Sequence, residues 1–307
     1  MATVKVKLST SETKGFLTFS QNLIKQIKRL GRVRMAETYT SALHSFISYY
    51  GERDVRWDEF DADLMMGYES YLAQRGLCPN TISFYMRNLR AIYNRAVDKA
   101  LTQQRYPFKH VYTGVDKTVK RATSLKSIRE IRDLDLSQSA GMDLARDLFM
   151  FSFYTRGMSF VDMAFLKKRD LKGGILSYRR RKTNQPLFIK WEQPMQDIID
   201  KYDTSGSAYL LPIIKPINVD EIQQYRNALH WVNKNLKSIG KMLKLTQPLT
   251  TYVSRHGWAS IAQSQNVPIS VICEAMGHDS ERTTRIYLAS LDTSGVDKAN
   301  RLILEAL

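Results

Sequence analysis

Arg255, His278 and Tyr287 lie near the end of the chain, and their types and order suit one kind of chemistry. A tyrosine hydroxyl has a pKa of about 10, so a nucleophilic tyrosine needs a neighbouring base or groups that stabilise its anion. A phosphate that passes through a five-coordinate state needs guanidinium or imidazolium donors on its non-bridging oxygens. Arginine and histidine supply these donors. The set therefore indicates phosphoryl transfer with a tyrosine nucleophile.

The spacing of these residues carries more weight than any one of them. The segment TTYVSRHGWAS places Arg255 directly before His256, and MGHDSERTTRIYLASL places His278 nine residues before Tyr287. The chain has 16 tyrosines, and a single tyrosine near the end of a helix is more often a packing or interface residue. An ordered set of Arg-His, Gly-His and Tyr rarely arises by chance, so the functional interpretation is favoured over the structural one.

The chain is strongly basic. Its 46 Lys and Arg outnumber its 30 Asp and Glu, which gives a net charge of +16 and an isoelectric point near 9.7. This balance favours a polyanionic partner, and together with the chemistry above it indicates DNA. The alternative is a basic surface that serves only solubility.

The rest of the composition indicates a cytoplasmic protein without metal or membrane contact. The N-terminal segment lacks the apolar core of a signal peptide, and no run of about 18 apolar residues occurs. Cys78 and Cys273 are far apart and have no second pair of metal ligands, so neither a disulfide framework nor a zinc site is expected. Both cysteines are predicted to be buried thiols in a reducing compartment.

Residues 1–104 are predicted to form a helical domain. Apolar residues recur at helical spacing in four segments, and Asp61 and Asn80 are candidate N-caps of the third and fourth helices. Four helices in so short a stretch indicate a small bundle. The expected helices are 16–30, 35–50, 61–76 and 80–96.

The fourth expected helix has a polar face that suits DNA. Arg87 and Arg90 share this face with Ser83 and Asn94, and such a row can contact phosphates or a groove. A solvated charged face is an equally good interpretation of this helix taken alone.

Residues 105–123 interrupt the periodicity and are predicted to be an interdomain linker, and residues 124–307 are predicted to form a second, mostly helical domain. One stretch of it, GGILSYRRRKTNQPLFIKW, has the pattern of strand, polar turn and strand, with strands at 175–178 and 187–189. Helices are expected at 221–245, 253–265 and 269–276. The fold class is therefore mainly α, with an N-terminal four-helix domain and an α-rich domain that holds a small β-hairpin.

The C-terminal segment resembles the signature of tyrosine recombinases and phage-type integrases, whose motifs run His-x-x-Arg-His, Leu-Gly-His and a terminal Tyr. The resemblance extends over nearly the whole chain, and it is to two-domain members without an arm-binding domain before Phe16. It implies a core-binding domain at residues 1–104 and a catalytic domain at 124–307. It further implies a site-specific recombinase that cuts and rejoins duplex DNA through a 3′-phosphotyrosine, without a cofactor, in integration, excision or inversion by a mobile element.

The family's site residues carry over to matching positions of this chain. Tyr287 would attack the scissile phosphate, while Arg255 and His278 would contact its non-bridging oxygens and His256 would support them. The resemblance also identifies Lys182, in the predicted hairpin, with the lysine that protonates the 5′-hydroxyl leaving group.

Lys182 has an alternative role as one more phosphate contact, because it lies in a run of basic residues. Its neighbours Arg179 and Arg181 are predicted to bind DNA. A lysine ammonium is a point charge that suits either task.

The chain departs from the family pattern at two positions. The residue three before Arg255 is Tyr252 instead of histidine, and a tyrosine hydroxyl can still hydrogen-bond a phosphate oxygen although it carries no positive charge. Ser159 stands where the family has its first arginine, three residues before the acidic Asp162. Arg156 lies one helical turn upstream and could supply the missing guanidinium. The alternative for Arg156 is a purely structural ion pair.

An apolar stripe follows the tyrosine and predicts a short amphipathic helix. In recombinases of this kind such a tail docks on a neighbouring protomer, and the resemblance implies a homotetramer that joins two sites through a Holliday junction. Packing of the tail on its own domain is the alternative. The stripe consists of Val296, Ala299, Leu302, Ile303 and Ala306.

Two other functions remain open from the sequence. A type IB topoisomerase uses similar phosphotyrosine chemistry, but it does not exchange strands between two sites. A DNA-binding accessory protein with a decayed site is favoured by Ser159 and Tyr252, which replace family residues.

Overall fold

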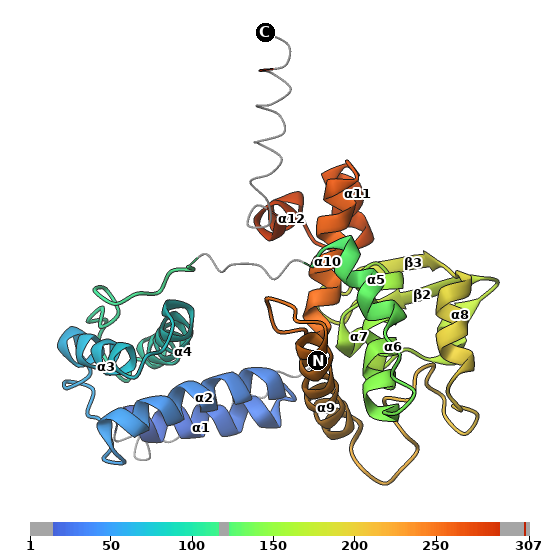
Figure 1. The fold of residues 1–307 in the computed structure, drawn as a ribbon. Coiled ribbons are helices and arrows are strands. Elements are labelled where there is room, and N and C mark those ends of the chain that lie inside the picture. Colours follow the sequence, from blue (N-terminus) through green and yellow to red (C-terminus); the bar gives the residue numbers. More distant parts are fainter. Residues whose placement is uncertain (1–14, 117–122, 289–303, 305–307) are drawn as a thin grey trace. The chain divides into compact units, whose positions relative to one another are not determined.

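The chain divides into two compact units. The computed structural model describes residues 15–116, 123–288 and 304, and the division falls between the first two of these ranges. Each unit has its own hydrophobic core. The two units are therefore described one at a time, with the element labels of Figure 1.

The N-terminal unit is a helical bundle around aromatic side chains. Phe16, Phe46, Phe60, Tyr68 and Tyr93 are fully buried, and their rings contact one another through stacked, tilted and edge-to-face pairs. Burial of such large apolar groups is what holds a small bundle together. The four predicted helices are confirmed as α1 (Phe16–Arg29), α2 (Val33–Tyr50), α3 (Ala62–Gln74) and α4 (Pro79–Asp98).

One of the two predicted N-caps is confirmed and the other is wrong. The Asp61 side chain accepts a 2.9 Å hydrogen bond from the backbone N–H of Leu64 and so begins α3. Helix α4 begins one residue earlier than expected, at Pro79, because proline suits the first helical position. Asn80 instead exchanges two hydrogen bonds with the backbone of Asp116.

The stretch 105–116, expected to belong to a linker, packs on the N-terminal unit. Phe108 and Val111 are buried in the same aromatic cluster as the four helices. The backbone N–H of Tyr112 donates a 2.7 Å hydrogen bond to the Glu69 carboxylate on α3. This stretch therefore covers part of the bundle surface.

The C-terminal unit is built around α6. This helix packs against α8, α9 and α10 (Figure 1). Phe149 and Phe151 on it are fully buried. The helices are α5 (Leu125–Asp133), α6 (Ala140–Tyr154), α7 (Phe160–Ala164), the 3-10 turn η1 (Lys168–Asp170), α8 (Gln193–Asp200), α9 (Glu221–Met242), α10 (Thr251–Ser264), α11 (Ile269–Ala275) and α12 (Glu281–Leu288).

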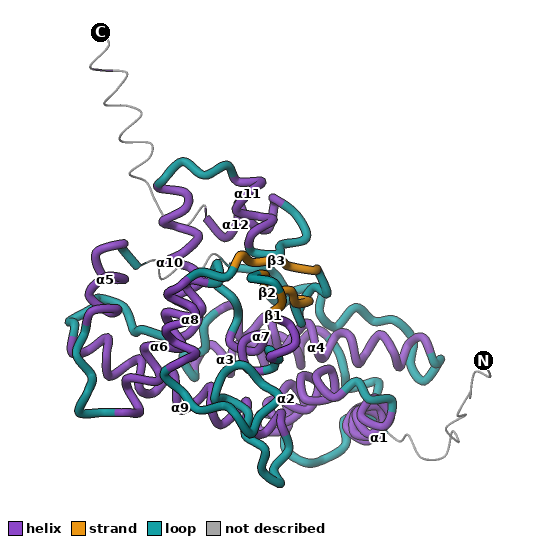
Figure 2. Tube along the Cα trace, turned by 90° about the vertical axis from the view of Figure 1, so that its right-hand side faces the viewer, coloured by secondary structure: helices purple, strands orange, loops and turns teal. Residues whose placement is uncertain are grey.

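A three-stranded antiparallel sheet contains the predicted hairpin. Strand β2 pairs with β1 on one side and β3 on the other, and Ser177 lies opposite Phe188. In Figure 2 the strands form a small orange group among the helices. Burial alternates along β3, with Leu187 and Ile189 inward. The strands are β1 (Leu171–Lys172), β2 (Ile175–Arg179) and β3 (Pro186–Lys190).

The predicted fold class, mainly α with a small sheet, is confirmed. Among the described residues, no helix is both long and apolar enough to cross a bilayer. The predicted tail stripe from Val296 to Ala306 lies outside the described residues.

Candidate active site

Arg255 and His278, which are 23 positions apart in sequence, are in direct contact in a buried cluster. Arg255, on α10, donates from Nη1 to the Gly157 carbonyl at 2.7 Å and from Nη2 to the Met276 carbonyl at 2.6 Å. Its Nη2 also lies 3.1 Å from His278 Nε2. The other ring nitrogen of His278 lies 2.8 Å from the Thr284 hydroxyl on α12. The cluster thus connects α10, the turn after α11, and α12.

The contacts of His278 define its protonation in this state. A guanidinium can only donate, so Nε2 accepts from Arg255 and Nδ1 carries the proton toward Thr284. Burial is the main cause that lowers the pKa of the His278 imidazole, to about 4. The positive charges of Arg255, Arg180 and Lys182 lower this pKa further. At neutral pH the ring is therefore neutral, with an acceptor lone pair on Nε2.

Tyr287 lies in α12, three residues after Thr284. Positions three apart on a helix are neighbours on its surface. Leu288 on the same helix is buried against Ala259 of α10 and Met276. These contacts fix α12 against α10 and the end of α11. The Tyr287 side chain lies outside the described part of the structure. The structure therefore gives the position of the Tyr287 backbone on α12 only.

Arg156 and Gly157 form the turn after α6, next to Arg255. Both residues have positive φ, 60° for Arg156 and 74° for Gly157. This conformation is uncommon for a residue with a side chain, and such strain is often found at functional sites. The turn carries the Gly157 carbonyl that Arg255 binds, so Arg156 is one residue from the contact that orients Arg255.

Arg156 lines the same pocket as His278. The pocket has a volume of about 580 Å³, and Gln185 of the hairpin also lines it, as do acidic residues that include Asp279 and Glu281. The Arg156 side chain is partly exposed and has neither a hydrogen bond nor an ion pair with another described residue. The structural ion pair considered for Arg156 is thus not formed within the described part of the chain.

Ser159 and Asp162 have structural contacts beside this turn. Ser159 is the N-cap of α7, and its hydroxyl donates to an Asp162 carboxylate oxygen at 2.6 Å. The other carboxylate oxygen of the buried Asp162 accepts a 2.8 Å bond from the backbone N–H of Arg181. Asp162 therefore joins α7 to the hairpin turn.

Lys182 is at the exposed tip of the β2–β3 turn. Its side chain has no hydrogen bond or ion pair with another described residue, yet its charge is close enough to influence His278. The turn is held against the His278 segment, because Thr183 donates to the Gly277 carbonyl at 3.3 Å and Gln185 donates to the His278 carbonyl at 3.3 Å. Its backbone position is thereby fixed relative to His278.

The arginines beside Lys182 differ in environment, which the sequence did not indicate. Arg179 and Arg181 are exposed; Arg179 donates to the Asn184 carbonyl, and Arg181 lies 4.1 Å over the Phe165 ring. Arg180, between them, is buried and donates to the Gly277 carbonyl. The alternation of β2, continued one residue past its end, explains the inward direction of Arg180.

Tyr252 and His256 lie on α10 near Arg255. The Tyr252 side chain is 56% exposed, and its ring packs edge to face on the ring of His256, with centroids 4.5 Å apart. His256 is buried. The structure thus places Tyr252 on the surface of the helix whose buried side carries Arg255.

The polar face predicted on α4 is partly covered. Ser83 is fully buried and donates to the Gly114 carbonyl at 2.6 Å, and Arg90 donates to the Thr113 hydroxyl at 3.3 Å. Ser83 is therefore not available to DNA, because the stretch 105–116 lies over it. Arg87 is exposed.

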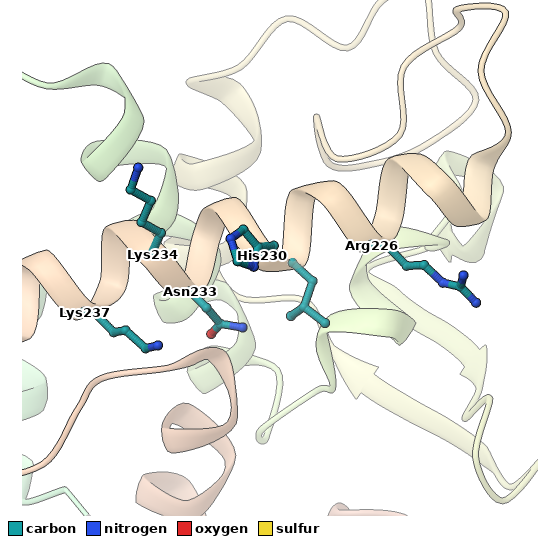
Figure 3. Close-up of a pocket in the computed structure, with 6 residues that line it drawn as sticks. Arg226, His230, Asn233, Lys234 and Lys237 are labelled. Atoms are coloured by element: carbon teal, nitrogen blue, oxygen red, sulfur yellow. The ribbon is translucent and has the colours of Figure 1, made fainter. Parts of the chain in front are cut away.

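A basic face on α9 was missed at the sequence level. After Glu221 the helix has no acidic residue, and its side chains line a shallow pocket of about 480 Å³ (Figure 3). A face rich in exposed basic side chains attracts phosphates. The polar residues of this α9 face are Arg226, His230, Asn233, Lys234 and Lys237.

Two further expectations concern cysteines and metals. Cys273 is buried as predicted, but Cys78 is exposed, because it precedes α4 at the surface. Within residues 15–116 and 123–288, no group of three or more His, Cys, Asp or Glu is arranged to hold a metal ion.

Two family models match the chain and together cover most of it. Residues 15–111 match the phage integrase SAM-like domain, and residues 161–294 match the phage integrase family. The chain belongs to the phage integrase family of tyrosine recombinases. Its activity is site-specific DNA recombination, as the resemblance implied. Comparison with curated protein sequences gives no significant match.

Solved structures of recombinases share the fold. A phage lambda integrase fragment, a dimer bound to a core site, has a TM-score of 0.70 and 12% identity over 90% of this chain and 96% of its own. The Tn1549 transposon integrase in complex with a circular-intermediate DNA has a TM-score of 0.65 and 15% identity over 96% and 100%. The XerH recombinase bound to a palindromic difH substrate has a TM-score of 0.64 and 15% identity over 94% and 85%.

Proposed function

We propose that this recombinase cleaves one DNA strand by attack of the Tyr287 hydroxyl on the scissile phosphate. The bond between the phenolic oxygen and phosphorus forms as the bond from phosphorus to the 5′-oxygen breaks, which leaves a 3′-phosphotyrosine. One phosphodiester, the 3′-phosphotyrosine, replaces another of similar energy, so rejoining needs no ATP. The observation that carries the proposal is the contact of Arg255 with His278, which Thr284 joins to the helix of Tyr287.

His278 supports the proposal through its neutral state. Nε2 accepts from Arg255 in the DNA-free protein, and its lone pair becomes available once Arg255 donates to the bound phosphate instead. Nε2 can then take the phenolic proton of Tyr287, and the resulting imidazolium can donate to a non-bridging phosphate oxygen. A bound phosphate adds negative charge beside the ring and therefore favours this charged form. Lys182 supplies the proton that the 5′-oxygen gains on leaving.

Arg156 provides the second guanidinium in this proposal. Its side chain lines the pocket that His278 lines and forms no ion pair with a described carboxylate, although Asp279 and Glu281 line the same pocket. A guanidinium there complements the charge that develops on the phosphorane. Ser159, which occupies the family's arginine position, caps α7 and holds Asp162.

The DNA surface is proposed to include the basic faces of both units. Arg87 and Arg90 on α4, Arg179 and Arg181 beside Lys182, and the α9 face would contact phosphates. One lambda integrase structure is a tetramer bound to a Holliday junction. We infer the same assembly here, a homotetramer on two recombination sites.

A suicide substrate tests the cleavage step. On a nicked recombination site, the wild-type protein should form a covalent adduct at a DNA 3′ end without Mg²⁺, and Tyr287→Phe should form none. An adduct that persists in Tyr287→Phe would show that Tyr287 is not the nucleophile. Products that join strands from two different sites would distinguish recombination from topoisomerase activity.

Tyr178 offers a matched control among the described tyrosines. It lies on β2 close enough to Asp162 and Arg255 to interact with both. Burial is the main cause that raises the pKa of its phenol, and the Asp162 carboxylate raises this pKa further. A protonated phenol is a poor nucleophile, so Tyr178→Phe should still form the adduct.

A further inference from the structure

The buried Arg180 has no role in the proposed chemistry, although it lies beside the reacting groups. Its side chain is 7% exposed, and Nη1 donates to the carbonyl of Gly277, the residue before His278. No carboxylate of the described residues pairs with it, and its Nε is buried without a hydrogen-bond partner within that part of the chain. A buried guanidinium in this state costs stability, so stability alone does not explain it.

Arg180 is part of the base of the turn that carries Lys182. Its backbone N–H donates to the Gln185 carbonyl at 2.9 Å, and its own carbonyl accepts from the Asn184 N–H at 2.7 Å. These two bonds close the turn around Lys182. A force that fixes the Arg180 side chain therefore also fixes the position of the turn.

The segment 276–278, whose Gly277 carbonyl Arg180 contacts, is held in place by other hydrogen bonds as well. The N–H groups of Gly277 and His278 donate to carbonyls of α11, and the buried Met276 accepts from Arg255 through its carbonyl. This segment keeps its position if Arg180 is replaced, whereas the hairpin turn loses its buried side-chain contact with Gly277. The turn then keeps the 3.3 Å bonds of Thr183 and Gln185 and the bond from the Arg181 N–H to Asp162.

Gly277 allows the hairpin to come this close. A Cβ atom at position 277 would lie 3.1 Å from Leu187 Cδ1 and 3.2 Å from Arg180 Cδ, and the residue has a φ of 60°. The contact between the Arg180 stem and the Gly277 backbone is therefore tight.

From these contacts we propose that Arg180 is a positioning residue that fastens the Lys182 turn to the Gly277–His278 segment. Lys182 and His278 then approach the scissile phosphate in a fixed mutual geometry. The inference rests on the proposed function, because it assumes that Lys182 protonates the 5′-oxygen.

Two substrates separate proton donation from the other steps. One suicide substrate keeps the bridging 5′-oxygen, and the other has sulfur at that position. A thiolate leaves without a proton far more readily than an alkoxide. Loss of the general acid should therefore slow cleavage of the oxygen substrate strongly and cleavage of the sulfur substrate little. Single-turnover cleavage is measured on both for Arg180→Met, Lys182→Ala and the double variant.

Arg180→Met should cut the oxygen substrate about 10- to 10³-fold more slowly and the sulfur substrate at nearly the wild-type rate. The double variant should be no slower than Lys182→Ala, since both changes remove the same proton transfer. Arg180→Lys keeps the charge and should recover part of the rate. Lys190→Gln, which removes an exposed charge at the end of β3, should leave both rates unchanged.

The outcomes distinguish the inference from the proposed function. If Lys182→Ala cuts the oxygen substrate at the wild-type rate, the proton-donor role of Lys182 is wrong. If Lys182→Ala behaves as expected but Arg180→Met slows both substrates equally, or the two losses multiply, the positioning role of Arg180 is overturned.

Should Arg180→Met not fold, Thr183→Val removes the second bond to the Gly277 carbonyl. It should show the same oxygen-selective loss at smaller size, and equal loss on both substrates would overturn the inference.

Discussion

Gly157 lies directly against Arg255: its carbonyl accepts a 2.7 Å hydrogen bond from Arg255 Nη1, and a Cβ at position 157 would lie 2.8 Å from the Arg255 Cα. No side chain fits in this space without displacing α10. The turn after α6 thus fixes both the position of Arg255 and its direction.

Gly157→Ala should destabilise the protein and slow cleavage. The left-handed backbone costs about 1–2 kcal/mol for alanine, and overpacking against Arg255 adds about 1–3 kcal/mol. Urea unfolding measures the sum. Gly173→Ala is the matched control, because Gly173 has a φ of 56° and open space around its Cα. Equal losses in the two variants would contradict the contact with Arg255.

Arg156→Ala should slow cleavage about 10²- to 10³-fold and change DNA affinity little. The phosphorane carries more negative charge than the ground-state diester, so a guanidinium aimed at it acts mainly on the rate. Arg156→Lys should recover only part, since an ammonium cannot form a bidentate fork. Single-turnover cleavage and equilibrium binding measure the two effects.

Ser159→Ala serves as the comparison for Arg156. It removes the α7 cap and should cost about 1 kcal/mol of stability, with a rate loss on the order of tenfold or less. Full cleavage activity in Arg156→Ala would mean that this arginine is structural.

His278 should remain neutral in the DNA-free protein until the pH falls to about 4. The ordinary histidine pKa is about 6.5, so between these values the unfolded chain takes up a proton that the folded chain does not. Acidification through this window should therefore lower the free energy of unfolding. NMR of the labelled imidazole checks the pKa directly, and a titration near 6.5 would contradict the buried contact with Arg255.

Neutralising the α9 face should weaken DNA binding at low salt and reduce its salt dependence. Removing one lysine that binds a phosphate makes the slope of log affinity against log salt shallower by about 0.9. The double variant Lys234→Gln/Lys237→Gln removes two charges of this face. Lys172→Gln/Lys190→Gln, on exposed ends of the sheet, is the charge-matched control. Identical salt slopes for the two pairs would exclude α9 from the interface.

Removing residues 296–307 should leave single-site cleavage measurable but weaken synapsis and strand exchange. The reason is the apolar stripe, which needs a groove to cover it and is expected to use that of a neighbouring protomer. Gel analysis of paired sites measures synapsis. Loss of folding in the truncated monomer would instead indicate that the tail packs on its own domain.

The sequence by itself determined the helical class and the hairpin, and it singled out Arg255, His278 and Tyr287 as a candidate set. Apolar periodicity reports which side of a helix or strand is buried, and motif spacing reports a shared chemistry; both are local properties of the chain. For the same reason the Asp61 cap and the strand pattern around Lys182 were predictable.

Only the tertiary structure showed which polar side chains form hydrogen bonds with residues far away in sequence. Arg255 meets the Gly157 carbonyl 98 positions away, and Arg180 meets the Gly277 carbonyl 97 positions away. Three adjacent arginines look alike in sequence, yet packing buries Arg180 alone, just as the stretch 105–116 buries Ser83. Burial and hydrogen bonding of a side chain depend on which other segments fold against it. A local sequence pattern does not predict that packing.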